Sequence, residues 1–181
     1  MNFYTYEGKI DFPHEAPSLR SIAVSLARES RYAGASIYWW PVALHTFVVC
    51  DLLPPALKIY GLLHDASECI LGDIPKPAKT SAIEIMENQI LWAIYRKCGL
   101  NPNVAFSDDI FDAVHVADAR TLHGEVYTVG TFSLRGVYPC DYEASQLVWK
   151  YFKQYSVLDC IDPNGACVAE FLRRFDEYRP N

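Results

Sequence analysis

The stretch Gly61-Leu-Leu-His-Asp-Ala-Ser-Glu-Cys-Ile-Leu-Gly-Asp-Ile-Pro-Lys-Pro-Ala-Lys79 organises this sequence. An apolar run over 59–63 leads directly into the adjacent pair His64 and Asp65, and Glu68 follows one helical turn later. Burying a helix end that finishes in an imidazole and a carboxylate is unfavourable unless these groups bind something. Histidine and aspartate are both common ligands of divalent metals, so the pattern favours a metal site over a solvated polar pair.

The length and composition of the chain predict one globular domain. The chain has 181 residues, of which 51% are hydrophobic, and this suffices for a sizeable core. No apolar run approaches the roughly 18 residues that a membrane span needs. The first nine residues lack the basic-then-apolar pattern of a signal peptide, and the six cysteines include no Cys-x-x-Cys pair. We therefore expect a cytoplasmic protein with reduced thiols and no structural zinc–thiolate site.

The charge and the aromatic content bear on partners. A net charge of −6 disfavours a nucleic acid polymer, because phosphate backbones bind basic surfaces. A single nucleotide remains compatible, since a metal and a few local cations can hold its phosphates. With 12 Tyr and 4 Trp in the chain, we expect some aromatic surface to serve self-association, and hence a homo-oligomer. No membrane partner is expected.

The spacing of apolar residues predicts an all-α bundle of about seven helices, in a single domain over 1–181 with an irregular N-terminal arm. Ser18 and Asp141 are expected N-caps, Asp162 is expected to cap the last helix, and Gly34 is expected to end the first. The arm covers 1–17, where a short hairpin could form. The helices cover 18–30, 41–53, 55–66, 83–95, 108–122, 141–155 and 163–178. A Pro-rich turn is expected over 73–80 and a linker over 130–139.

Two of these helices each offer a further metal ligand. His45 stands in the apolar run 42–49, where a lone histidine would by default be a satisfied core residue. Asp118 stands among small apolar residues, where an unpaired carboxylate would be unfavourable. An ion pair with Arg120 or Lys79 is the alternative explanation for Asp118. With the central pair, the two candidates would make a site of two imidazoles and two carboxylates, open to water and a phosphate oxygen.

Several short motifs stand in a fixed order around these four candidates, His45, His64, Asp65 and Asp118. They are Thr5-Tyr-Glu-Gly-Lys9, Arg31-Tyr-Ala-Gly34, Val42-Ala-Leu-His-Thr46, the opening stretch and Val116-Ala-Asp118. This order resembles the HD-domain phosphohydrolases over roughly residues 3–125. It is closest to a subgroup common in bacteriophages and bacteria, which is similar to the bacterial 5′-deoxynucleotidases and includes phage dATP triphosphohydrolases.

The resemblance implies an HD-domain-like fold and a divalent ion, such as Zn, Co, Mn or iron, held by those four ligands. It also implies a catalytic role for Glu68, which can orient a water or assist proton transfer, against the alternative of an ordinary surface glutamate. Asp73 would lie at the substrate, and a role in capping the Ile-Pro segment is an equal alternative.

Four residues are expected to bind the substrate. Arg31 can grip a phosphate with two parallel hydrogen bonds, and the neighbouring Tyr32 can stack on a base. Lys79, and less directly Lys76, could contact phosphates, although both also fit ordinary solvated charges in a Pro-rich loop.

The remaining aromatic and imidazole side chains near the motifs are not expected to be ligands. Trp39 and Trp40 fit core packing better than a pocket wall. His115 and His123 are expected to lie outside the ligand set. Two departures from the subgroup bear on substrate choice: Leu44 precedes the first histidine where a polar residue is usual, and His115 stands where a basic residue is common.

Three functions stay open at this stage. The first is a triphosphohydrolase that releases tripolyphosphate from a deoxynucleoside triphosphate, with dATP preferred. The second is a 5′-deoxynucleotidase that acts on monophosphates. The third is a metal-binding or nucleotide-binding module without catalytic activity.

Overall fold

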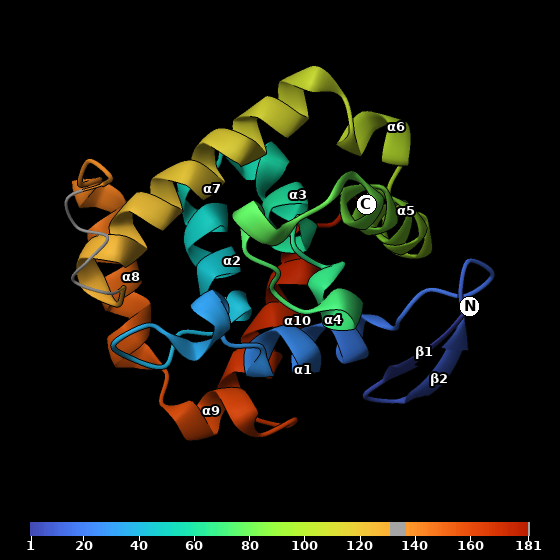
Figure 1. The fold of residues 1–181 in the computed structure, drawn as a ribbon, viewed down its shortest axis with the longest axis horizontal. Coiled ribbons are helices and arrows are strands. Elements are labelled where there is room, and N and C mark those ends of the chain that lie inside the picture. The colour runs from blue at the N-terminus through green and yellow to red at the C-terminus, as the bar shows by residue number, and fades with distance from the viewer. Residues whose placement is uncertain (131–136, 181) are drawn as a thin grey trace.

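The computed structural model describes residues 1–130 and 137–180 (Figure 1). Its elements in chain order are β1 (Asn2–Thr5), β2 (Gly8–Asp11), α1 (Leu19–Arg28), α2 (Val42–Leu52), α3 (Lys58–Leu63), α4 (Glu68–Leu71), α5 (Ser81–Lys97), α6 (Pro102–Ala105), α7 (Asp108–Thr128), α8 (Tyr142–Gln154), α9 (Val157–Ile161) and α10 (Ala166–Tyr178). Short 3₁₀ turns cover Arg31–Gly34, Pro55–Leu57 and Lys76–Ala78.

The prediction of an all-α fold is confirmed. Among the described residues, the only strands are β1 and β2, which form one antiparallel hairpin with Asn2 paired to Asp11 and Thr5 to Gly8. The hairpin lies in the N-terminal arm, at the edge of the helical body (Figure 1). In the described part of the chain, no helix is both long and apolar enough to cross a membrane.

Helix α2 forms the centre of the core. All nine residues from Val42 to Cys50 are buried, as expected of a helix that is apolar on every side. It packs against α1, α3, α7, α8 and α10. Figure 1 shows α7 crossing above α2 and the pair α1 and α10 below it. A polar side chain on α2 is therefore enclosed by other helices.

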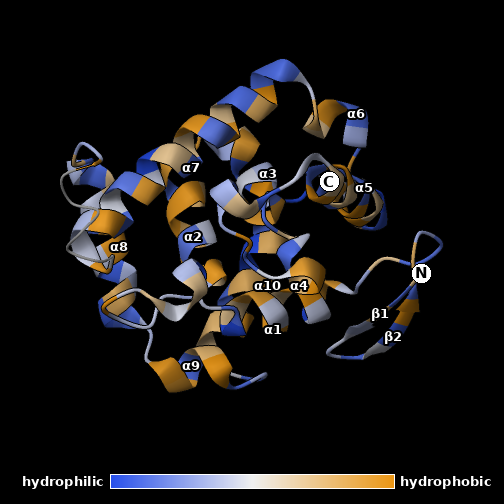
Figure 2. Ribbon diagram, viewed as in Figure 1, coloured by the Kyte–Doolittle hydropathy of each residue, from blue (hydrophilic) through white to orange (hydrophobic). Residues whose placement is uncertain are grey.

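The outer helices are amphipathic. In Figure 2, α7 and α8 carry hydrophilic and hydrophobic residues in alternation along their length, which is typical of helices with one solvent-facing side. Both helices pack against each other and against α2, and the residues they bury include Val114 and Val126 of α7 and Val148 of α8. The packing of α7 against α8 and α2 fixes the position of any side chain that α7 directs inward.

Two expected N-caps are confirmed, and two helix boundaries were wrong. The side chains of Ser18 and Asp141 accept backbone hydrogen bonds at the starts of α1 and α8. Asp162 does not begin the last helix: it ends the short α9, and α10 begins after Gly165. Nor does Gly34 end α1, which stops at Arg28 because the chain is extended from position 29.

The end of the helix expected over 55–66 was also wrong, and this matters for the site. Helix α3 ends at Leu63, and the backbone then makes tighter bonds, from the N–H of Ala66 to the carbonyl of Leu63 and from the N–H of Glu68 to the carbonyl of Asp65. His64 and Asp65 therefore lie in the turn between α3 and α4. Their side chains lie close together, with Asp65 Oδ2 3.2 Å from His64 Nε2.

Other lengths differ as well. Three short helices, α4, α6 and α9, were not predicted, and α7 extends to Thr128, past the expected end at 122. The linker expected over 130–139 falls mainly on residues 131–136, which lie outside the described residues. The longer α7 brings a further acidic residue, Glu125, to the inner face of the bundle.

Gly124 marks the closest approach of α7 to α8. A Cβ atom at this position would lie 2.6 Å from the carbonyl carbon of Ala144 and 2.7 Å from the backbone nitrogen of Ser145. Helix propensity alone favours alanine over glycine by about 1 kcal/mol. The added methyl group would, however, overpack against backbone atoms of α8, which destabilises a protein by about 1–3 kcal/mol.

We expect Gly124→Ala to lower the free energy of unfolding, measured by urea denaturation, because backbone atoms of α8 cannot yield as a flexible side chain would. Val116→Ala, on the exposed side of the same helix, is the control and should change stability little. A Gly124→Ala protein more stable than wild type would contradict this account of the α7–α8 contact.

Candidate metal centre

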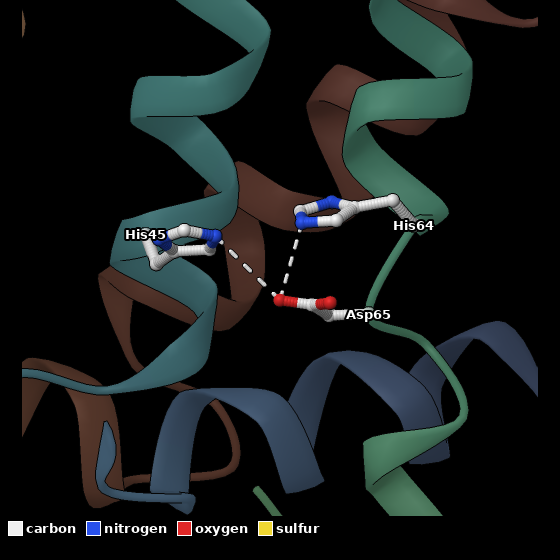
Figure 3. Close-up of side chains that lie close together, drawn as sticks. All are labelled: His45, His64 and Asp65. Atoms are coloured by element: carbon white, nitrogen blue, oxygen red, sulfur yellow. Dashed lines mark ion pairs between the residues drawn. The ribbon is translucent and has the colours of Figure 1, made fainter. Parts of the chain in front are cut away.

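Three side chains from two separate parts of the chain converge at the inner end of α3. His45 is fully buried in the middle of α2, while His64 and Asp65 follow α3 in the turn. Figure 3 shows both imidazole rings directed at the Asp65 carboxylate. One ligand atom from each residue lies within 4.8 Å of the other two. Asp65 Oδ2 is 3.2 Å from His64 Nε2 and 3.6 Å from His45 Nε2.

The hydrogen bonds of the two rings leave the inward-facing nitrogens free. His64 Nδ1 lies 2.8 Å from the Gly61 carbonyl, which can only accept, so Nδ1 carries the hydrogen. His45 Nδ1 lies 2.7 Å from the carboxylate of Glu125. Both Nε2 atoms are buried and make no hydrogen bond among the described residues. A buried polar atom without a partner is unfavourable, and a metal ion between the two rings would satisfy both.

Asp118 approaches the same centre from α7. Its Oδ1 lies 3.1 Å from His45 Nε2, close enough for an ion pair but not aligned as a hydrogen bond. Asp118 is not within the tight group formed by the other three residues. The alternative partners proposed for it are occupied elsewhere. Arg120 pairs with residues of α8 and the loop before it, and Lys79 pairs with Glu87 at 2.8 Å. Its position is compatible with a fourth ligand.

The charges in this centre shift one another's proton affinities. Burial and the nearby Arg31 charge lower the pKa of His45, but Glu125 and Asp118 outweigh them and raise it to about 9. Burial raises the pKa of Asp65, but the two imidazoles lower it to well below the ordinary range of a carboxyl. The carboxylates of the centre thus stabilise positive charge on the imidazoles, and the same carboxylates would stabilise the charge of a divalent cation.

Glu68 lies at the start of α4 and is buried, so the alternative of a surface glutamate was wrong. Its Oε2 has no hydrogen-bond partner among the described residues. Burial, helped by the negative charges of Asp65 and Asp73, raises the pKa of Glu68 well above its ordinary value. A carboxyl with a raised pKa in a buried site can hold and transfer a proton.

The carboxylate of Asp73 contacts the segment after α1, which neither of its two expected roles, a place at the substrate or a cap on the Ile-Pro segment, had included. Its carboxylate accepts a hydrogen bond of 3.1 Å from the backbone N–H of Tyr32, and its own N–H donates to Glu29. Gly72 before it has a φ of 77°, which glycine adopts without strain. Asp73 therefore ties the Pro-rich loop to the segment after α1.

The four expected substrate-binding residues have different surroundings. Arg31 is held by two carboxylates, at 3.2 Å from Glu125 and 3.7 Å from Asp65, and the Tyr32 hydroxyl donates to the same Glu125. Lys79 is ion-paired, and Lys76 is exposed without an ion pair in the described part of the chain. Of the three cationic side chains predicted to bind the substrate, Arg31 thus lies nearest the centre.

Glu125 is the site residue that the sequence interpretation missed. It is fully buried and accepts hydrogen bonds from His45, Arg31, Tyr32 and Trp40. The available signal was its position seven residues after Asp118, two turns further along the same helical face. Trp40 is fully buried, as expected of a core residue, and donates its indole N–H to this carboxylate.

A small cavity borders the centre between α5 and α7. Its volume is about 120 Å³, and its lining includes His64 and Asp118 beside the aromatic rings of Tyr95, Phe106 and Phe111. His115 also lines it, stacked on Phe111, while His123 contacts Tyr138; neither belongs to the three-residue group. A larger groove of about 620 Å³ lies between the hairpin and α5, and no predicted site residue lines it.

Comparison with known proteins adds little to this geometry. No protein-family model matches the chain. It is 33% identical over 104 residues to the uncharacterized protein YfdR of Escherichia coli (strain K12). That alignment covers 56% of this chain and 58% of the relative. This similarity assigns neither a family nor an activity to the chain.

We expect Zn²⁺, Co²⁺ or Mn²⁺ to raise the melting temperature by about 5–10 °C at a large excess over the dissociation constant, because the ion binds only the folded centre. His64→Ala should abolish this shift, measured by calorimetry. His14→Ala, which removes an exposed imidazole of the N-terminal arm, should retain it. Equal shifts in the two variants would place metal binding elsewhere.

Metal affinity should also depend on pH. The pKa of His45 is raised to about 9, so its imidazole is protonated at lower pH and must lose that proton to bind a metal. We expect the Co²⁺ affinity to rise by about tenfold per pH unit for each proton displaced, up to about pH 9. Titrations at several pH values in non-chelating buffers would measure it. A constant affinity over this range would contradict the assignment of His45 as a ligand.

Proposed function

We propose that this protein is a metal-dependent phosphohydrolase that acts on deoxynucleotide phosphates. The observation that carries the proposal is the pair of Nε2 atoms of His45 and His64, which are buried, make no hydrogen bond and face one carboxylate. The buried carboxyl of Glu68 follows three positions after Asp65, whose charge helps to raise its pKa. The spacing of motifs that resembles HD-domain phosphohydrolases supports the same reading.

The residues divide into holding and reacting groups. His45, His64, Asp65 and Asp118 would hold a divalent ion, which lowers the pKa of a bound water and draws charge from a phosphate oxygen. Glu68 would accept a proton from the attacking water at its unbonded Oε2. The new bond joins the water oxygen to phosphorus, the bond from phosphorus to the ester oxygen breaks, and the proton passes to the leaving oxygen.

The candidate substrates share this chemistry. Cleavage between the α-phosphorus and the 5′ oxygen gives a deoxynucleoside in both cases, with tripolyphosphate from a triphosphate or orthophosphate from a monophosphate. The triphosphate, with dATP preferred, is the first proposal because of the phage subgroup that the motifs resemble. One observation favours the monophosphate: Arg31 and Lys79 are already ion-paired, which leaves few free cations for a longer phosphate chain.

We expect the metal-loaded protein to release a deoxynucleoside from one class of substrate when it is incubated with single dNTPs and dNMPs and the products are separated by chromatography. Tripolyphosphate from dATP supports the first proposal, and orthophosphate from a dNMP supports the alternative. Failure on every nucleotide would overturn both and leave a binding module.

Asp118→Ala should reduce turnover by about two orders of magnitude or more, because it removes an expected ligand. Asp112→Ala removes an exposed acid from the same helix and is the matched control, with wild-type turnover expected. Full activity in Asp118→Ala would exclude it from the centre.

A further inference from the structure

The carboxylate of Glu125 has two oxygens that serve two different parts of the centre. Oε1 accepts from the Trp40 indole at 2.6 Å and from His45 Nδ1 at 2.7 Å. Oε2 accepts from the Tyr32 hydroxyl at 2.6 Å and from Arg31 Nε at 3.2 Å. The side chain is fully buried, so water does not substitute for any of these four donors. A buried carboxylate with this many donors has a fixed position.

We propose that Glu125 is the positioning residue that assembles this centre. Through Oε1 it keeps the hydrogen of His45 on Nδ1 and so presents Nε2 to a metal. Through Oε2 it holds the segment Arg31–Gly34, here called the arginine arm, against the same centre. The inference rests on the metal site in the proposed function, but it concerns assembly and not turnover.

The arginine arm has a backbone that needs such support. Tyr32 and Ala33 have φ values of 59° and 51°, in the left-handed region that side chains other than glycine seldom adopt. Residues in this region persist only where the surroundings impose the conformation, and they are frequent at functional sites. Two hydrogen bonds tie Tyr32 to distant parts of the chain: its hydroxyl donates to Glu125 and its N–H donates to Asp73.

The same conformation directs the Arg31 side chain inward. Its Nη1 lies 3.7 Å from Asp65 Oδ2, the carboxylate oxygen that both imidazoles face. The arm and the metal-binding cluster therefore meet at Asp65 as well as at Glu125. A change at Glu125 should disturb both parts, whereas a change at the Tyr32 hydroxyl should disturb the arm alone.

Glutamine at position 125 separates these possibilities because it has nearly the same shape but only one oxygen. Its amide nitrogen donates, so one pair of donors must face another donor. Arg31 and the Trp40 indole cannot accept a hydrogen bond, so each side holds one donor that cannot adapt. The remaining oxygen stays on the side of the charged Arg31, where its hydrogen bond is stronger, and the amide nitrogen faces Trp40 and His45. There His45 can accept at Nδ1 if its hydrogen moves to Nε2. That tautomer no longer offers Nε2 to a metal. We therefore expect Glu125→Gln to weaken metal binding without removing any ligand.

The experiment measures Co²⁺ affinity by visible absorption and the rate of tryptic cleavage after Arg31 in the metal-free full-length protein. Glu125→Gln should lower the affinity by about 10–100-fold, as losses of supporting bonds to metal ligands do, and should accelerate the cleavage. Tyr32→Phe should accelerate the cleavage and keep the wild-type affinity. Wild-type affinity in Glu125→Gln, or unchanged cleavage in Tyr32→Phe, would overturn the proposal.

Two controls exclude general loosening of the fold. Glu170→Gln removes a carboxylate that pairs with Arg173 and Arg174 on α10, and Tyr155→Phe removes a hydroxyl that accepts from Gln154. Both should match the wild type in Co²⁺ affinity and in cleavage after Arg31. If these controls change as much as the test variants, the effect is global and the proposal fails.

If Glu125→Gln does not fold, the zinc-loaded wild type decides the same point. Its ¹⁵N spectra should show His45 with a protonated Nδ1 and a metal-bound Nε2, and the opposite tautomer would overturn the proposal. None of these measurements uses a substrate. A protein that passes them all but hydrolyses no nucleotide would refute the proposed function and leave the role of Glu125 intact.

Discussion

The buried imidazole of His45 imposes the constraint on which the rest of the centre depends. It stands in the middle of α2, a helix enclosed on all sides, where neither ring nitrogen can be satisfied by solvent. Nδ1 is satisfied by Glu125, whereas Nε2 faces the Asp65 and Asp118 carboxylates without a hydrogen bond in the described chain. A buried polar group of this kind is retained only where something offsets its desolvation. The need to offset this desolvation explains why three acids, Asp65, Asp118 and Glu125, lie around the His45 imidazole.

The architecture follows from meeting that constraint with helices that are remote in sequence. Helix α7 crosses α2 and brings Asp118 and Glu125 to it from one inner face, while the turn after α3 carries His64 and Asp65. The arginine arm, the 3₁₀ turn Arg31–Gly34, closes another side. Each element would be ordinary by itself. Their convergence at a single point makes a phosphohydrolase centre the function that we propose.

Much of this could be read from the sequence, and the failures have physical reasons. Apolar spacing identified the long helices, because the burial pattern of a helix is a local property of the sequence. The adjacent pair His64 and Asp65 was recognised because both residue types are metal ligands and follow an apolar run directly. The break after Leu63 was missed because residues 64–67 contain neither glycine nor proline, the residues that most clearly signal the end of a helix. Glu125 was missed because its importance comes from four partners, three of them 85 to 94 positions earlier in the chain, which spacing on a single helix cannot reveal. The paired state of Arg31 depends on that same missed residue.

The most direct test of the central claim is anomalous diffraction from crystals of the protein grown with Co²⁺ or Zn²⁺. The account predicts one strong peak bound by the Nε2 atoms of His45 and His64 and by the Asp65 carboxylate, with Asp118 as the fourth protein ligand. His45 Nδ1 should still face Glu125 in that crystal. A peak elsewhere, or coordination through Nδ1 of either histidine, would contradict the account.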